Sequence, residues 1–124
     1  MTRTRVSSGS PYEATTGFSR GVRVGSHIAV AGTAPIWPDG EVDPDPVAQA
    51  RRCWQIALTA LAELGGRVED VVRTRQYVVS ADLADAVGGV HGEMFGEIRP
   101  VSTMVAGLLD PRWLCGVELD AVVD

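Results

Sequence analysis

The sequence contains no long hydrophobic run, and its apolar stretches are interrupted by glycine and proline. Because a membrane-spanning helix needs about 20 apolar residues in succession, we expect no membrane partner. The basic start, Met1-Thr-Arg-Thr-Arg5, is not followed by the apolar core of a secretion signal. The two cysteines, Cys53 and Cys115, form no CxxC pair and are more typical of a reducing cytosol than of a disulfide framework. We therefore predict a cytoplasmic protein.

An excess of positive charge is also absent. Sixteen acidic residues against eleven basic ones give a formal net charge of −5. Nucleic-acid-binding domains are normally basic, so we predict no nucleic-acid partner. The two histidines have no third residue at a metal-ligand spacing, and we predict neither a metal site nor a cofactor.

The composition that is present is that of a folded protein. A hydrophobic fraction of 45% and a charged fraction of 22% are close to globular averages. A length of 124 residues predicts a single domain over residues 1–124. Residues 1–16 are rich in Ser, Thr, Gly and Pro and lack periodicity, which predicts an N-terminal arm packed on the surface.

The first half of the chain predicts a β-hairpin followed by a long helix. Residues 18–24 and 27–33 are strand-like segments joined by the turn dipeptide Gly25-Ser26. Asp45 and Pro46 are suited to the cap and first position of a helix over residues 46–64. Gln49 and Gln55 lie away from its apolar stripe. That stripe comprises Val47, Ala50, Trp54, Ala57, Leu58 and Leu61.

The second half predicts a strand over residues 71–79, a helix that begins at Asp82, and closing strands over residues 102–107 and 117–123. Gly88, Gly89 and Gly92 each cost this helix about 1 kcal/mol relative to alanine. They therefore need tertiary support, either from the sheet or from a neighbouring subunit. The order β-β-α-β-α-β-β predicts an α+β domain, a mixed sheet with two helices on one face. The other face needs a partner, and a symmetric oligomer is the usual solution.

Five segments in this order resemble the Rid (YjgF-like, UK114-type) family. They are Gly17-Phe-Ser-Arg-Gly-Val22, Val30-Ala-Gly-Thr-Ala-Pro35, Val71-Val-Arg-Thr-Arg75, Arg99-Pro100 and Val117-Glu-Leu-Asp-Ala121. The resemblance implies a chorismate-mutase-like fold and a barrel-forming homotrimer with small-molecule clefts between subunits. It also implies hydrolysis of reactive imines and enamines.

The residues of the family's deaminases are mostly replaced in this chain. The resemblance assigns the place of the carboxylate-binding arginine to Ser102 and that of a tyrosine to Phe18. The serine, asparagine and cysteine positions carry Ala31 (beside Gly32), Gly89 and Met104. The glutamate that positions or activates water is retained as Glu118. Since an arginine–carboxylate fork is about twice as strong as a neutral hydrogen bond, a standard 2-imino acid should bind poorly.

Several of these side chains have two interpretations. Glu118 is either an exposed or barrel-lining carboxylate or a general base. Arg75 shares a strand face with Tyr77, and we favour an ion pair with Glu118 or Asp120 over the binding of a substrate anion. His91 is more typical of a surface or interface residue than of a catalyst. Trp37 either caps the cleft or fills a subunit interface.

The sequence thus predicts an enzyme for an imine, enamine or related carbonyl compound that lacks a free α-carboxylate. Glu118 would act as general base or water holder, while Ser102 and Thr103 would supply hydrogen bonds. The alternative is a trimer without catalytic activity that binds a metabolite or has a regulatory role.

Overall fold

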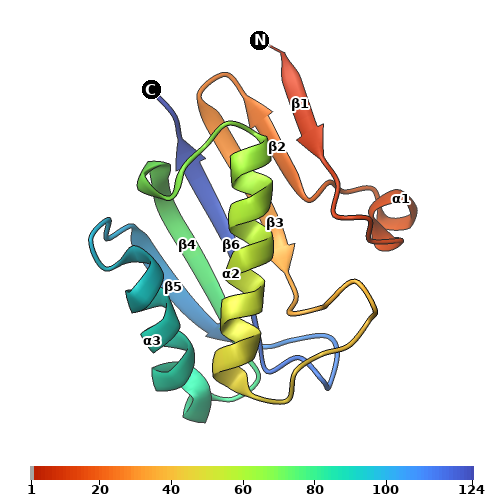
Figure 1. The fold of residues 1–124 in the computed structure, drawn as a ribbon, viewed down its shortest axis with the longest axis vertical. Helices are drawn as coiled ribbons and strands as arrows, with labels where there is room; N and C mark the ends of the chain where they lie inside the picture. Colours follow the sequence, from red (N-terminus) through yellow and green to blue (C-terminus); the bar gives the residue numbers. More distant parts are fainter. Residues whose placement is uncertain (1) are drawn as a thin grey trace.

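A mixed sheet of six strands, in the order β1-β2-β3-β6-β4-β5, forms the centre of this protein (Figure 1). The structure is a computed structural model and describes residues 2–124. The strands are β1 (Arg3–Val6), β2 (Gly21–Val24), β3 (His27–Thr33), β4 (Val71–Val78), β5 (Val101–Ala106) and β6 (Cys115–Val122). The helices are α1 (Tyr12–Thr16), α2 (Pro46–Glu63) and α3 (Ala84–Phe95), with 3₁₀ turns η1 (Val68–Asp70) and η2 (Ala81–Leu83).

The predicted order of elements is confirmed over most of the chain, and the N-terminal arm is the main correction. This arm contains β1, which pairs antiparallel with β2, and the short helix α1. The edge strand β1 was missed because only one of its residues, Val6, is even half-buried, so its sequence has no apolar alternation. The first hairpin strand is also shorter than predicted, since β2 begins at Gly21 and leaves Phe18 in the preceding loop.

The long helix α2 ends within one residue of its predicted C-terminus and begins as predicted. The carboxylate of Asp45 accepts a hydrogen bond from the amide of Ala48 at 2.9 Å, and Pro46 occupies the first turn. At the other end, Gly65 has a φ of 86°, and Gly66 donates to the carbonyl of Leu61 at 2.9 Å. Trp54 is fully buried, as its helical spacing predicts.

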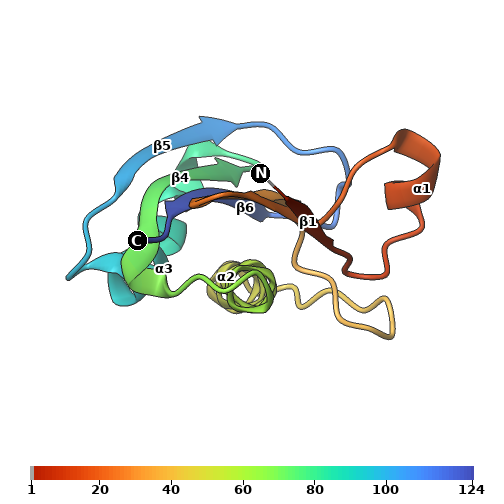
Figure 2. The same ribbon diagram turned by 90° about the horizontal axis from the view of Figure 1, so that it is seen from above.

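Helices α2 and α3 cover one face of the sheet, as predicted (Figure 2). The core between these layers contains Ile28, Trp54, Leu61, Val87, Phe95, Val117 and Leu119. Phe95 of α3 is buried in this core, and Met94 lies half-buried beside it. Neither α2 nor α3 covers the opposite face, which has only the short helix α1 at its edge; we call it the open face. In residues 2–124 no helix has both the length and the apolar character needed to cross a membrane.

Candidate functional site

The open face carries Glu118 where β6 runs between β3 and β4. Along β6, Val117 and Leu119 are buried towards the helices, so the alternation of a strand directs Glu118 away from the core. Its Oε2 lies 3.6 Å from Nη1 of Arg75, the residue directly opposite on β4. Its Oε1 accepts a hydrogen bond from the Tyr77 hydroxyl. The predicted ion pair of Arg75 is therefore present, and both carboxylate oxygens have protein partners.

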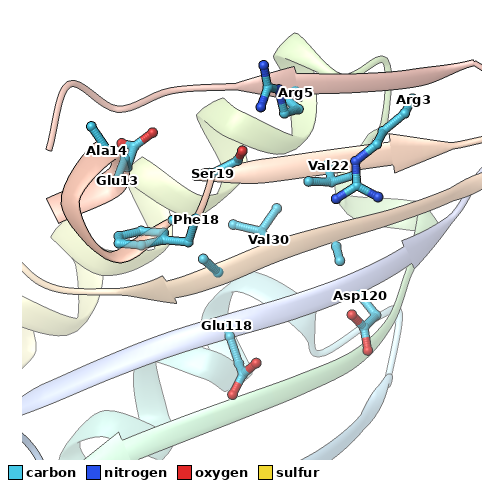
Figure 3. Close-up of a pocket in the computed structure, with 13 residues that line it drawn as sticks. Arg3, Arg5, Glu13, Ala14, Phe18, Ser19, Val22, Val30, Glu118 and Asp120 are labelled. Carbon is cyan, nitrogen blue, oxygen red and sulfur yellow. The ribbon is translucent and has the colours of Figure 1, made fainter.

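A hollow of about 700 Å³ opens beside this carboxylate on the same face (Figure 3). Arg3 and Arg5 of β1 line one side, and Glu118 and Asp120 of β6 line the other. Glu13 and Phe18 lie at one end of the hollow. Three carboxylates thus face two guanidinium groups, so the hollow has no excess of positive charge. Val22, Ala29 and Ala31 supply apolar surface between the two sides.

Two predicted pocket residues reach the hollow because a buried arginine fixes the chain around them. Arg20 is 8% exposed, and its guanidinium donates to the carbonyl of Gly32 at 2.6 Å and to Thr33 Oγ1 at 3.1 Å. These bonds bridge an irregularity in the pairing of β3 with β6 between Val30 and Thr33. Phe18 and Ala31 therefore line the hollow, with Gly32 adjacent in sequence.

A second group of predicted residues lies on the helix-covered side of β5. Ser102 pairs with Thr74 of β4, and its Oγ lies 2.8 Å from Thr74 Oγ1 and 3.2 Å from Gln76 Nε2. Thr74 Oγ1 is also 2.8 Å from Nε2 of His91 on α3. The ring of His91 packs against Phe95 with centroids 4.7 Å apart, and burial lowers the pKa of this imidazole.

The remaining predicted residues are divided between the helix-covered side of the sheet, the open face and places away from both groups. Met104 lies on the helix side of β5, 3.9 Å from where a Cβ of Gly88 would lie, whereas Thr103 is opposite Arg75 on the open face. Gly89 is exposed on α3. Trp37 lies in the loop after β3, 42% exposed, with its ring 4.1 Å from the guanidinium carbon of Arg52. It lines neither group.

The predicted site residues therefore do not come together within one chain, because they lie on two different sides of the sheet. Phe18, Ala31, Arg75, Thr103 and Glu118 are on the open face, while His91, Ser102 and Met104 are on the other side of the sheet. The reason is the two-residue period of a strand, which turns consecutive residues such as Ser102 and Thr103 to opposite faces.

Sequence reasoning missed the residues that complete both groups. Arg3, Arg5 and Glu13 lie in the arm that had been interpreted as surface packing. Tyr77 was noted only as a neighbour of Arg75, and Thr74 and Gln76 only as members of a strand face. Their partners depend on the register between β4 and its two neighbours, which no local pattern contains.

The cysteines do not contribute a nucleophile. Both are buried and free, and Cys53 Sγ lies 3.8 Å from the carbonyl oxygen of Cys115. The pKa of the Cys53 thiol is raised, first by its hydrogen bond to Cys115 and then by burial, so it stays protonated at neutral pH. Within residues 2–124, no three His, Cys, Asp or Glu side chains are grouped so as to hold a metal ion.

The fold and the hollow define a small α+β domain with a mixed six-stranded sheet whose open face carries a paired glutamate. The family model described as endoribonuclease L-PSP matches residues 9–123. The chain belongs to this family, also called the YjgF/UK114 family.

Relatives that match nearly the whole chain support this assignment. The chain is 42% identical over 122 residues to the uncharacterized protein SCO2049 of Streptomyces coelicolor, covering 94% of this chain and 90% of that protein. It is 33% identical to the RutC family protein PYRAB12510 of Pyrococcus abyssi, with 85% and 84% covered. The crystal structure of Rv2704 from Mycobacterium tuberculosis superimposes with a TM-score of 0.89 at 42% identity, covering 98% of this chain and all of that one.

Proposed function

We propose that this protein is an enzyme that hydrolyses an imine, enamine or related carbonyl compound lacking a free α-carboxylate. The observation that carries the proposal is the position of Glu118 beside an open hollow, in a chain of the YjgF/UK114 family. The hollow combines apolar surface between its two sides with charged groups along them, which suits a small organic molecule that carries a polar group. Family membership supports a role with small molecules in general.

In this proposal, Glu118 holds a water molecule and accepts one of its protons as the oxygen adds to the carbon of the C=N bond. The proton passes to the nitrogen and gives a carbinolamine. The new hydroxyl group then gives up its remaining proton to the nitrogen as the C–N bond breaks, and a carbonyl compound and ammonia leave. An enamine enters the same route after it takes up a proton at carbon. Tyr77 and Arg75 hold the carboxylate in place during these steps.

The proposal also includes a homotrimer. Because Glu118 and Ser102 lie on opposite sides of the sheet in one chain, a cleft lined by both needs a second copy. The β5 edge of one subunit placed against the hollow of the next would bring the two groups together. This arrangement also gives the open face a partner.

The decisive experiment compares wild-type protein with Glu118→Gln. A neutral imine is generated in situ by oxidation of an amine, and the release of ammonia above the spontaneous rate is followed. We expect Glu118→Gln to abolish this acceleration while the melting temperature and the oligomeric state stay nearly unchanged. A 2-imino acid serves as the comparison substrate and should be hydrolysed weakly by both proteins, since Ser102 offers no positive clamp.

Retained activity in Glu118→Gln would end the catalytic proposal, and rapid hydrolysis of the 2-imino acid would show that the role given to Ser102 is wrong. One observation favours a second candidate, a trimer that binds a metabolite without transforming it. Both oxygens of Glu118 are engaged by Tyr77 and Arg75, as in a structural ion pair. In that case a bound compound should raise the melting temperature and be recovered with unchanged mass.

The ribonuclease activity in the family's name is not part of this proposal. RNA binding requires a basic surface that contacts phosphates. The hollow instead has three carboxylates and two arginines, and the whole chain has a net charge of −5.

A further inference from the structure

The polar side chains between β4, β5 and α3 form a hydrogen-bonded chain with a defined direction. Gln76 Nε2 can only donate, so its contact of 3.2 Å uses one acceptor site of Ser102 Oγ. Thr74 Oγ1 donates to the same oxygen at 2.8 Å and uses the other. With the single hydroxyl proton of Thr74 directed to Ser102, the 2.8 Å contact between Thr74 Oγ1 and His91 Nε2 is a donation from the Nε2–H tautomer of the imidazole.

The hydrogen-bonded chain leaves one donor, the hydroxyl proton of Ser102, without a partner among residues 2–124. With both acceptor sites of its oxygen occupied, the Ser102 hydroxyl has only its proton to offer, and no acceptor for that proton is present among residues 2–124. Thr74 and Gln76 are 0% and 5% exposed, whereas Ser102 is exposed. The hydrogen-bonded chain therefore runs outward from a half-buried imidazole to one solvent-facing donor.

The neighbouring side chains polarise the Ser102 hydroxyl but give it no positive charge. Each donation in the sequence His91, Thr74, Ser102 polarises the next hydroxyl, and the partly buried setting strengthens the effect. Across the described chain, no arginine hydrogen-bonds any of these three side chains. The buried Oε1 of Gln76 has no partner there, so the cluster also keeps one unused acceptor.

We propose that Ser102, polarised through Thr74 and His91, is a binding residue for an uncharged carbonyl oxygen of the ligand. An amide or ketone oxygen accepts one hydrogen bond from a neutral donor without needing a cation, whereas a carboxylate loses its hydration without gaining a counter-charge. The inference deepens the proposed function, on which it rests for the cleft that the ligand occupies.

The test uses pyruvamide and pyruvate, which are similar in size and differ in charge. Calorimetric titration of the wild-type protein should show pyruvamide bound about tenfold more tightly than pyruvate. Ser102→Ala should weaken pyruvamide about three- to tenfold and leave pyruvate unchanged, because one neutral hydrogen bond is lost. Since Ser102 is exposed, this variant should keep its fold.

A spectroscopic measurement tests the relay itself. Infrared spectra of pyruvamide with ¹³C-labelled carbonyl groups should show a lowered stretching frequency when the compound is bound. Thr74→Val, which removes the hydroxyl at nearly constant shape, should partly restore the free frequency. Thr74→Ser keeps the hydroxyl and should retain the lowered frequency, which controls for any loss of stability at this buried position.

Three results would overturn the inference: tighter binding of pyruvate than of pyruvamide, unchanged pyruvamide affinity in Ser102→Ala, or an identical bound frequency in Thr74→Val. These readouts are independent of catalysis. Selective loss of pyruvamide in Ser102→Ala, together with full activity in Glu118→Gln, would remove the catalytic proposal and leave the neutral binding residue in place. Unchanged pyruvamide affinity in Ser102→Ala, together with abolished activity in Glu118→Gln, would remove the neutral binding residue and leave the catalytic proposal in place.

Discussion

At the scale of single residues, Tyr77 has two charged neighbours, Glu118 and Arg75, which shift the pKa of its phenol in opposite directions. The pKa of Tyr77 is raised above its ordinary value of 10.0, chiefly by the hydrogen bond to Glu118, with burial and the charge of Glu118 adding to it. The charge of Arg75 acts in the opposite direction. The cluster therefore keeps the phenol protonated, and its hydroxyl donates a hydrogen bond to the carboxylate.

This cluster predicts a pH dependence whose sign is determined by the raised pKa. As the pH rises, the unfolded chain loses the phenolic proton before the folded one does. The contribution of Tyr77 to the free energy of unfolding is therefore complete below pH 10 and is lost as the pH rises through the folded value. Ultraviolet titration of Tyr12→Phe, in which Tyr77 is the sole remaining tyrosine, should show ionisation above pH 10.

Two further variants check the cause of this shift. Glu118→Ala should return the pKa of Tyr77 towards its ordinary value, and Arg75→Met should raise it further. A shift in the same direction in both variants would contradict the assignment of Glu118 as the main cause.

At the scale of elements, the clearest departure from the sequence pattern is Gln49 on α2. It lies off the apolar stripe, yet it is 1% exposed. Its amide donates to the carbonyls of Asp43 and Arg112 at 2.7 and 2.9 Å, and its oxygen accepts from the amide of Leu114 at 2.8 Å. One buried side chain thus joins α2 to the loops before it and before β6.

Replacing Gln49 should therefore be far more damaging than its place on the helical wheel indicates. Gln49→Leu leaves three backbone groups without partners, and we expect the free energy of unfolding to fall by about 3 kcal/mol. Urea denaturation measures the change. The matched control is Gln55→Leu on the exposed side of the same helix, which should change stability by less than about 0.5 kcal/mol. Equal effects in the two variants would refute the role of Gln49.

The glycines of α3 do not find their explanation within one chain. A Cβ on Gly89 or Gly92 would meet nothing within 4 Å, so close contact with the sheet is not the reason for glycine at these positions. The other explanation that the sequence allowed for these glycines is close packing of a neighbouring subunit against α3, and this explanation stays a prediction.

Gly92→Ala separates these possibilities. If nothing packs on this face of α3, the alanine should raise the free energy of unfolding by about 1 kcal/mol through its better helix propensity. Denaturant titrations at several protein concentrations would measure it. If stability falls instead, and falls most at high concentration, a second copy packs closely against Gly92.

At the scale of the whole molecule, the open face exposes apolar side chains that a second copy of the chain could cover. Val101 and Val105 of β5 are 58% and 45% exposed, on the same face as the ion pair between Arg75 and Glu118. Exposed apolar side chains beside an ion pair, on a sheet face that α2 and α3 do not cover, are consistent with the proposed trimer.

Val105→Glu tests the trimer by placing a charge at this face. Sedimentation of the wild-type protein should give three times the 13.1 kDa chain mass. The variant should dissociate towards the single chain, because a buried unpaired carboxylate is strongly unfavourable. Thr59→Glu, which adds the same charge on the exposed side of α2, should leave the mass unchanged. A wild-type mass of one chain would refute the trimer directly.

Much of this architecture could be predicted because it depends on local periodicity. The spacing of apolar residues was sufficient for α2, and the dipeptide Gly25-Ser26 was sufficient for the β2–β3 hairpin. The same alternation correctly directed Glu118 away from the core. The strand β1 was missed because an edge strand that buries almost nothing leaves no apolar pattern.

By itself, the sequence determined most of the elements, the apolar side of α2 and of β6, and membership of a family that retains a glutamate at position 118. Only the tertiary structure decided which side chains meet: Tyr77 and Arg75 on Glu118, Thr74 and His91 behind Ser102, and Arg20 beneath Gly32. The physical reason is that periodicity arises from contacts between residues a few positions apart. Strand register and bulges instead depend on how segments distant in sequence pair.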